Sequence, residues 1–448
     1  MKTTTTKALV AASVTLILFS CKPEIDFTTP NQGSIDVSKY VAIGNSNTAG
    51  YADNALYQRA QLVTYSNLLS QQFKAINGQT FKQPLVNANS VGIGSFQNAR
   101  YALIPSTDCS GAISLAPVQV AASGDFTIFT TSVAGDGPFN NMGVPGVKAV
   151  TAIYPGYGNP SNGVGNFNPY FTRMTTNPAS ASVLSDAAAQ NPTFFTMSMG
   201  DDDVLTYALA GGAADAITPS AGPAGFGFDA SIDVIVNTLT MNGAKGVIAN
   251  IPHITNIPFF ITVPYNGLLL DAANATALST AYAPLGISFQ PGYNSFIIED
   301  INAPGGLRKI TDGELILLSV PQDSLKCKGW GSMKPIPNKY VLTSTEVLQI
   351  KDATNAYNAK LKSVADAKGL AYVDVNGFMN SLKTGITYNG VTLKTQFVAG
   401  GAFSLDGVNL TPIGNALLAN QFIKSINAKY GSGIQQIDAT KYKGIVFP

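Results

Sequence analysis

Histidine, cysteine and charged residues are all scarce in this chain. Of its 448 residues, one is histidine, three are cysteine and 12% are charged. The 27 Lys and Arg residues nearly balance the 26 Asp and Glu residues. Nucleic acids and anionic membrane surfaces are bound through an excess of basic side chains. A charge balance as close as this one therefore indicates neither partner. The sequence also has no C-x-x-C or C-x-x-H spacing, so it carries no motif for a zinc site.

The first 20 residues have the features of a cleavable secretory signal. Two lysines precede an apolar run of twelve residues, and the segment LFSC places a small residue directly before Cys21. Such a run is too short to span a bilayer, and a basic leader before it is typical of a signal peptide. The alternative is a short apolar helix at the start of a cytosolic protein.

The cysteine at the end of this leader resembles the modified residue of a bacterial lipoprotein. The resemblance implies that residues 1–20 are removed and that Cys21 becomes the lipidated first residue. The expected location is then the cell envelope, as an outer-membrane lipoprotein that is periplasmic or surface-exposed. Residues 21–38 are polar and contain two prolines, so we expect a flexible tether between the lipid and the folded body.

Two cysteines lie in the body of the chain, Cys109 in STDCSG and Cys327 in SLKCKGW. In an exported protein two such cysteines are expected to form a disulfide bond, because the compartment is oxidising. Two buried free thiols are the alternative.

Residues 39–448 have the composition of a globular chain and predict one domain with long insertions near 75–140 and 255–345. Apolar periodicity indicates helices near Leu62–Phe73 and Leu418–Ile426, with strands between the helical segments. Short apolar runs that read as strands buried on both faces occur at 39–44, 193–200, 246–252 and 370–375. We therefore predict an α/β fold, a three-layer α/β/α sandwich of flavodoxin-like type with a central, mostly parallel sheet.

Four short segments combine glycine with polar side chains that are suited to chemistry. A serine in a tight glycine-bounded turn can present its hydroxyl as a nucleophile, and parallel sheets gather such groups at the carboxyl ends of their strands. The segments are GNSNTAG (44–50), NMGVPG (141–146), MGDDDVLTY (199–207) and SLDGVNLTP (404–412).

In this order the four segments resemble the conserved blocks of the SGNH, or GDSL-like, hydrolases. The resemblance extends from about residue 40 to residue 430. It implies that Ser46 is the nucleophile, that the N–H of Gly143 contributes to an oxyanion hole, and that Asp406 is the acid of the catalytic triad. Asp202 stands where the family has an oxyanion-binding asparagine, and Asn409 stands where it has the catalytic histidine. The stretch VPQDSLKCKGWGS and the closing helix resemble a lipoprotein branch of the family in Bacteroidetes-type bacteria.

Two of these matched positions lack the residue that the chemistry needs. A serine hydroxyl is a weak nucleophile until a base takes its proton, and the carboxamide of Asn409 cannot accept a proton near neutral pH. An oxyanion hole stabilises negative charge with hydrogen-bond donors, whereas Asp202 would repel that charge unless it is protonated. Removing a triad member typically slows turnover by about four to six orders of magnitude.

Few other side chains could supply a base or a metal site. His253 follows the strand expected at 246–252, so we expect it at the same edge of the sheet as Ser46. It could lie close enough to Ser46 to act as its base, or it could have no part in proton transfer. Asp201 to Asp203 together with Asp406 could form a calcium site, or simply a solvated acidic loop. We predict no metal site and no cofactor.

Two functions are open on the sequence alone. The first is a pseudoenzyme that keeps the fold for binding a carbohydrate or lipid ligand, or for assembly with an outer-membrane protein. The second is an active serine esterase or deacetylase that hydrolyses ester bonds of acylated carbohydrate or lipid at the cell envelope. Because two catalytic positions are altered independently, the sequence favours the pseudoenzyme.

Overall fold

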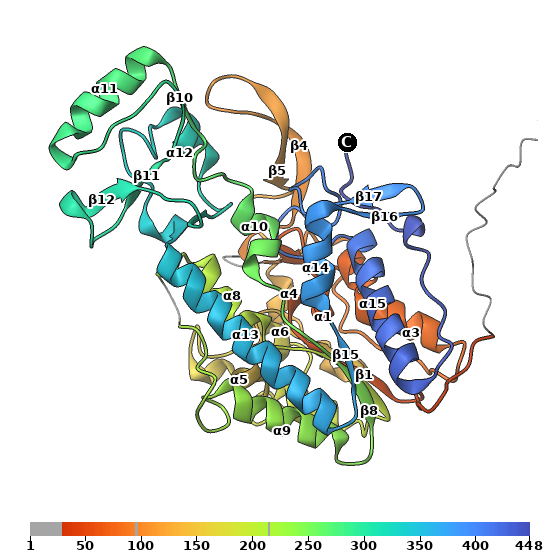
Figure 1. Cartoon of the computed structure of the whole chain (residues 1–448). Helices are drawn as coiled ribbons and strands as arrows, with labels where there is room; N and C mark the ends of the chain where they lie inside the picture. Colours follow the sequence, from red (N-terminus) through yellow and green to blue (C-terminus); the bar gives the residue numbers. More distant parts are fainter. Residues whose placement is uncertain (1–28, 95–96, 214–215) are drawn as a thin grey trace, which may run out of the picture.

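A five-stranded parallel sheet forms the centre of the protein, which we describe from a computed structural model covering residues 29–94, 97–213 and 216–448 (Figure 1). The strand order is β15-β8-β7-β1-β6, and every neighbouring pair is parallel. The strands are β1 (Tyr40–Gly44), β6 (Asn141–Gly143), β7 (Phe194–Ser198), β8 (Lys245–Ala249) and β15 (Ala371–Val373). The prediction of an α/β fold with a central parallel sheet is confirmed.

The strands form where the sequence is apolar and β-branched on both faces. All five residues of β1 are buried, and the rings of Tyr40 and Phe73 pack edge to face with centroids 4.9 Å apart. Each of the four predicted apolar runs overlaps one of these strands. Strand β6 is the exception, because its three residues lie in a segment that was recognised for its glycines rather than for strand character.

Helices cover both faces of the sheet, as a three-layer sandwich requires (Figure 1). On one face α3 (Tyr65–Phe73) packs on α15 (Pro412–Tyr430), and the rings of Tyr65 and Phe422 stack 4.6 Å apart. The other face carries α7 (Val183–Ala188), α9 (Phe228–Thr240) and α13 (Ser344–Ala367), with Phe228 and Tyr357 stacked 3.9 Å apart. The two predicted helical segments are found, although Leu62 lies before α3 and is exposed.

Capping residues fix where the two long helices begin. Thr411 precedes Pro412 at the start of α15, and its Oγ1 accepts a hydrogen bond from the N–H of Gly414. Thr343 and Glu346 form a capping box at the start of α13. Shorter elements around the sheet include α1 (Ser46–Ala49), β2 (Tyr51–Ala52), β3 (Ala55–Leu56), α2 (Gln58–Gln61), α5 (Ala149–Ala152), α6 (Pro169–Thr172), α8 (Asp201–Leu209), α14 (Val375–Thr384), β16 (Ile386–Tyr388) and β17 (Val391–Leu393).

The order of the strands places a switch in chain direction beside β1. From β1 the chain first adds β6 on one side and then returns to add β7, β8 and β15 on the other. This is the flavodoxin-like order, and in such sheets ligands bind outside the carboxyl ends of the strands at the switch point. The loops that follow β1 and β7 therefore lie where a site is expected.

The first described residues are packed on the body. Ile35 and Val37 are buried in the main hydrophobic core, and Ser34 donates a backbone hydrogen bond to Tyr430 at 3.0 Å. The prediction of a flexible tether up to residue 38 therefore extends too far, because two apolar side chains inside this polar stretch fill the core. The predicted signal peptide, the lipidation of Cys21 and the tether up to residue 28 lie outside the described residues.

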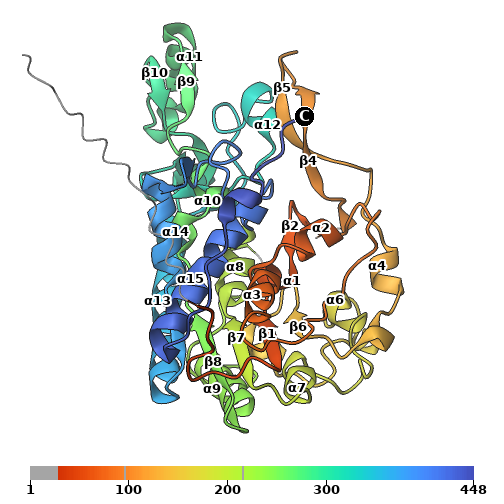
Figure 2. The same ribbon diagram turned by 90° about the vertical axis from the view of Figure 1, so that its right-hand side faces the viewer.

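Parts of both predicted insertions, the β4–β5 hairpin and the segment around α11 and α12, stand above the sheet (Figures 1 and 2). The first contains a hairpin of β4 (Tyr101–Thr107) and β5 (Ile113–Gln119), followed by α4 (Thr127–Thr130). The second has small hydrophobic clusters of its own, around Phe296 and around Phe289. Its elements are α10 (Pro258–Ile261), β9 (Leu268–Leu270), α11 (Ala272–Tyr282), β10 (Gly292–Asn294), β11 (Ile297–Glu299), β12 (Leu307–Lys309), β13 (Leu315–Ile316), α12 (Gln322–Cys327) and β14 (Val341–Leu342).

A disulfide bond between Cys109 and Cys327 joins the two insertions, which confirms the predicted pairing. Cys109 lies in the turn of the β4–β5 hairpin, and Cys327 is the last residue of α12. Beside it the ammonium group of Lys326 lies 3.2 Å from a carboxylate oxygen of Asp108. The hairpin is thus held against the second insertion at its tip.

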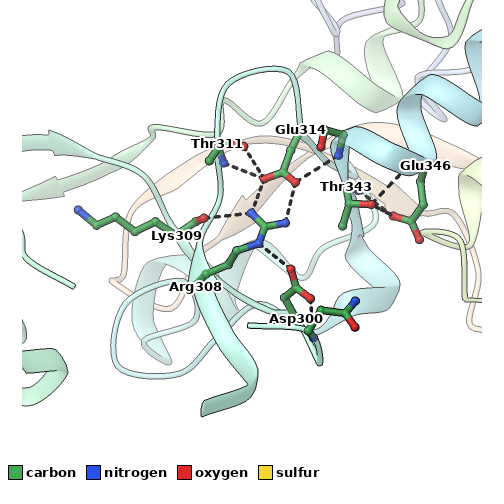
Figure 3. Close-up of polar contacts among 9 residues, drawn as sticks. Asp300, Arg308, Lys309, Thr311, Glu314, Thr343 and Glu346 are labelled. Carbon is green, nitrogen blue, oxygen red and sulfur yellow. Dashed lines mark hydrogen bonds and ion pairs between the residues drawn. The ribbon is translucent and has the colours of Figure 1, made fainter. Parts of the chain in front are cut away.

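Glu314 anchors the second insertion to the start of α13 (Figure 3). Its carboxylate accepts hydrogen bonds from both terminal nitrogens of Arg308, at 2.6 and 2.7 Å. It also accepts from the backbone N–H groups of Thr311 at 2.8 Å and Ser344 at 3.2 Å. Burial alone would raise the pKa of Glu314, but these hydrogen bonds outweigh it and lower the pKa to about 2.

None of the helices within the described ranges combines the length and the hydropathy that a membrane-spanning helix needs.

Candidate functional site

Ser46 lies at the carboxyl end of β1, at the switch point of the sheet. It is the first residue of the short helix α1, and it is half-buried. Asn45 caps the helix, because its side-chain oxygen accepts a hydrogen bond from the N–H of Asn47 at 3.3 Å. The predicted nucleophile is therefore on a strand-to-helix turn, as the sequence indicated.

Gly143 lies directly against this turn. A Cβ atom at Gly143 would be 2.3 Å from the backbone nitrogen of Ala49, so only glycine lets β6 approach α1 this closely. The N–H of Gly143 donates to the side-chain oxygen of Asn141 at 2.9 Å, and Asn141 in turn donates to the carbonyl of Thr48 at 2.8 Å. The predicted oxyanion donor is thus beside the end of α1, and its hydrogen atom is engaged within the protein.

The three aspartates of the third segment begin α8, immediately after β7. Gly200 precedes them with a φ of 113°, a conformation that favours glycine. Asn45 donates from Nδ2 to a carboxylate oxygen of Asp201 at 2.8 Å, which joins the loop after β7 to the loop after β1. Asp203 accepts from the N–H of Ala149 at 2.7 Å.

Asp202 is buried, and its Oδ2 has no hydrogen-bond partner within the described part of the chain. Burial raises the pKa of its carboxyl to about 8, with a further contribution from the negative charges of Asp201 and Asp203. Burial also raises the pKa of Asp201 and of Asp203 to about 6. At neutral pH Asp202 is therefore mostly a neutral acid that can donate a hydrogen bond. The expected repulsion of an oxyanion applies to an ionised Asp202, and the raised pKa favours the neutral form in this environment.

Asp406 and Asn409 form a closed pair in the loop before α15. Asn409 donates from Nδ2 to Oδ2 of Asp406 at 2.9 Å. Oδ1 of Asp406 accepts from the N–H groups of Val408 and Asn409, both at 2.8 Å. Oδ2 also accepts from the N–H of Asn54 at 3.1 Å, so four hydrogen bonds hold this carboxylate.

The loop before α15 is hydrogen-bonded to a turn that follows shortly after Ser46. Asp53 and Asn54 have φ values of 51° and 64°, and they connect β2 to β3 in the left-handed conformation of a tight hairpin turn. The N–H of Asp53 donates to Oγ of Ser404 at 3.0 Å, and the N–H of Leu405 donates to Oδ1 of Asp53 at 2.9 Å. The sequence analysis missed this turn, although an Asp-Asn pair between two short apolar segments is a recognisable signal for it.

The four predicted segments therefore meet at the carboxyl edge of the sheet. Gly143 contacts α1, Asp201 is bonded to Asn45, and Asp406 is bonded to the turn that follows α1. Among the described residues, no hydrogen bond joins Ser46 to Asp406 or to Asn409. The structure thus assembles the frame of the site without showing a proton relay that ends at the serine.

His253 belongs to a different cluster. It follows β8, which is separated from β1 by β7 in the sheet. Its backbone N–H donates to the side-chain oxygen of Asn376 on α14 at 2.9 Å. Burial lowers the pKa of its imidazole, as do the nearby charges of Lys351 on α13 and Lys383 on α14. The single histidine therefore lies beside these two helices, and among the described residues no hydrogen bond joins it to Ser46.

A cavity of about 530 Å³ opens beside the site. Its walls come from four segments, within residues 47–63, 100–103, 404–415 and 441–448. Asn47, the neighbour of Ser46, lines it, as do Asp53 and Ser404. Sequence reasoning missed this cavity because its walls come together only in the folded chain.

Within the residues that the structure describes, no group of three or more His, Cys, Asp or Glu side chains is arranged to hold a metal ion. This includes the acidic residues at the start of α8, which the sequence left open as a calcium site.

No protein-family model, no curated protein and no solved structure matches this chain.

Proposed function

We propose that this chain is a lipid-anchored protein of the cell envelope with the fold of the SGNH hydrolases, and that it works as a pseudoenzyme. In this proposal Cys21 carries the anchor, and the site around Ser46 binds a carbohydrate or lipid ligand or helps assembly with an outer-membrane partner. The flavodoxin-like strand order supports the fold assignment, as does the meeting of four separate segments at one edge of the sheet.

The pairing of Asn409 with Asp406 is the observation that carries the proposal. In a serine hydrolase the acid orients a histidine, which takes the proton of the serine. Here a carboxamide is the partner of the acid, and a carboxamide cannot take up that proton. His253 follows β8, which β7 separates from β1 in the sheet, and no hydrogen bond among the described residues joins it to Ser46, so the one histidine of the chain offers no replacement for the base.

The environment of Asp202 favours the second candidate function, an active esterase or deacetylase. A neutral Asp202 can donate a hydrogen bond where the family uses an asparagine, which offsets one of the two replacements. Asp201, whose pKa is raised by burial to about 6, is bonded to the residue that precedes Ser46 and would be the base in this case. Its substrate would be an acylated carbohydrate or lipid.

Hydrolysis of 4-nitrophenyl acetate by the full chain distinguishes the pseudoenzyme from the active esterase. The pseudoenzyme proposal predicts the same slow background rate for the parent protein, for Ser46→Ala and for the control Ser123→Ala, which changes an exposed serine. A rate that disappears in Ser46→Ala and persists in Ser123→Ala would establish the esterase instead.

A further inference from the structure

Two arginine side chains line the cavity beside Ser46 without an acceptor for their hydrogen atoms. These are Arg59, which is exposed, and Arg100, which is half-buried. In the described ranges neither guanidinium makes a hydrogen bond or an ion pair with the protein. The ring of Tyr57 lies against Arg100, with its centroid 5.4 Å from the guanidinium carbon, and the charge of Arg100 also acts on the carboxyl of Asp53 without a hydrogen bond between them.

The other two arginines in the described structure are used differently. Arg173 donates to the carbonyl oxygens of Pro84 and Leu85 at 2.8 and 3.0 Å. Arg308 is bonded to Glu314 and Asp300. Because a guanidinium carries five N–H donors, a half-buried one that faces a cavity without an acceptor is suited to an anion from outside.

The charge of the cavity has the sign that an anion needs. Lys441 and Lys443 line it together with the two arginines. Asp53 is the acidic side chain among the lining residues, and its carboxylate accepts hydrogen bonds from the hydroxyl of Tyr57 at 2.5 Å and from Leu405. Burial raises the pKa of Asp53, against the hydrogen bonds from Tyr57 and Leu405 and the charge of Arg100, which lower it. The positive charges therefore exceed the negative charge that could balance them.

Aromatic and aliphatic groups form much of the remaining wall. Tyr57 and Tyr101 line the cavity on the side of β4, and Ile445 and Phe447 line it from the last residues of the chain. These last residues lie beside the β4–β5 hairpin in both views of the molecule (Figures 1 and 2). A volume of about 530 Å³ is in the range of small-molecule sites, which combine apolar walls with a few placed polar groups.

We propose that this cavity binds an amphipathic anion, with a carboxylate or phosphate head at Arg100 and Arg59. The apolar body of the ligand, an acyl chain or an aromatic ring, lies against the tyrosines and the last residues of the chain. The inference deepens the proposed binding function by naming the chemistry of the ligand. It rests on the cavity and not on the residue at position 409, so it can be tested separately.

Calorimetric titration of the full chain tests the head group. The probes are dodecanoate and dodecyl phosphate, each below its critical micelle concentration, and uncharged dodecanol below its solubility limit. We expect at least one of the anions to bind at least about tenfold more tightly than dodecanol, and its affinity to fall as salt is added. The tighter of the two anions identifies the head group. Equal binding of all three compounds, or no binding of either anion, overturns the inference.

Variants of Arg100 test the residue. Arg100→Gln should weaken binding of the anion by about tenfold or more and leave dodecanol unchanged, whereas Arg100→Lys should keep part of the affinity. Lys368→Gln is the matched control, because it removes one positive charge from an exposed position at the end of α13. If Arg100→Gln does not fold, the inference is tested by Arg59→Gln and by the comparison of anion and alcohol binding to the parent protein. Unchanged affinity in a folded Arg100→Gln contradicts the inference.

Ser46→Ala separates this inference from the proposed function. Ester hydrolysis is compared between Ser46→Ala and the parent protein, while anion binding is measured on the parent protein, whose cavity Ser46 does not line. Ser46-dependent ester hydrolysis would overturn the pseudoenzyme and leave the anion site standing. Absence of anion binding would overturn the anion site and leave the pseudoenzyme proposal standing.

Discussion

The side-chain nitrogen of Asn409 lies 2.9 Å from Oδ2 of Asp406, to which it donates a hydrogen bond. In a hydrolase of this type the same acid would receive the N–H of an imidazole. The amide reproduces the hydrogen bond and holds the loop against the turn at Asn54, but it has no basic atom to offer Ser46. The pair therefore has a structural role that is independent of catalysis.

Replacing Asn409 by alanine tests this structural role. The change removes one hydrogen bond to a buried carboxylate, so we expect the free energy of unfolding in urea to fall by about 1–3 kcal/mol. Asn89→Ala is the matched control, because Asn89 is exposed, and it should change stability by no more than about 0.5 kcal/mol. Equal stability of the two variants would show that the pair contributes nothing to the fold.

Replacing Asn409 by histidine tests whether the frame of the site is intact. Asp406 can accept the N–H of an imidazole at this position, which would leave the second ring nitrogen as a base. We expect Asn409→His together with Asp202→Asn to raise the rate of aryl ester hydrolysis by about a hundredfold or more. The same double change in a Ser46→Ala background should produce no increase. If the rate does not rise, the segments meet in a geometry unsuited to catalysis.

The buried Asp202 predicts a pH dependence of stability. Burial raises its pKa to about 8 in the folded protein, from about 3.9 in an unfolded chain. The folded state therefore holds a proton that the unfolded chain has released, so this contribution is full below about pH 4 and is lost as the pH rises to about 8. We expect the free energy of unfolding to fall by about 2–4 kcal/mol between pH 5 and pH 8.

Asp202→Asn should make this profile flatter, because an amide does not titrate. Asp312→Asn, at an exposed position, is the control and should keep the slope of the parent protein. The free energy of unfolding of all three proteins is measured by urea unfolding at intervals of one pH unit. A slope that Asp202→Asn leaves unchanged would mean that Asp202 is ionised in the folded protein.

The disulfide between Cys109 and Cys327 predicts both a loss of stability and a local effect. The two residues are 218 positions apart, so the bond closes a long loop, and its removal should cost about 2–4 kcal/mol. Cys109→Ser, Cys327→Ser and the double variant should lose the same amount, because each removes the same bond. Hydrogen exchange should become faster in the β4–β5 hairpin, and an unaltered exchange rate there would contradict the anchoring role.

The sequence predicted the sheet and the meeting of the four segments for one physical reason. Strands buried on both faces are recognisable as short apolar runs, and parallel strands bring their carboxyl ends to one edge. Gly143 and Asp201 therefore fell beside α1 although more than 50 residues separate them in sequence. The prediction of helix positions used the same apolar periodicity, which failed at Leu62 because that residue precedes the helix.

Features that depend on burial or on distant contacts could not be predicted from the sequence in the same way. Nothing in the letters GDDD indicates that Asp202 is enclosed and that its pKa rises. The cavity draws its walls from four segments, so Arg100 had no local signal that placed it near Ser46. The packing of Ile35 on the core was hidden by the polar residues around it.

Reaction with a fluorophosphonate tests the central claim most directly, because such reagents form a stable bond only with a serine whose hydroxyl is activated by a base. Intact mass and peptide mapping of the full chain would locate any adduct. The pseudoenzyme account predicts no adduct at Ser46 in the parent protein, while Asn409→His with Asp202→Asn becomes labelled there. Stoichiometric labelling of Ser46 in the parent protein, absent from Ser46→Ala, would contradict the account.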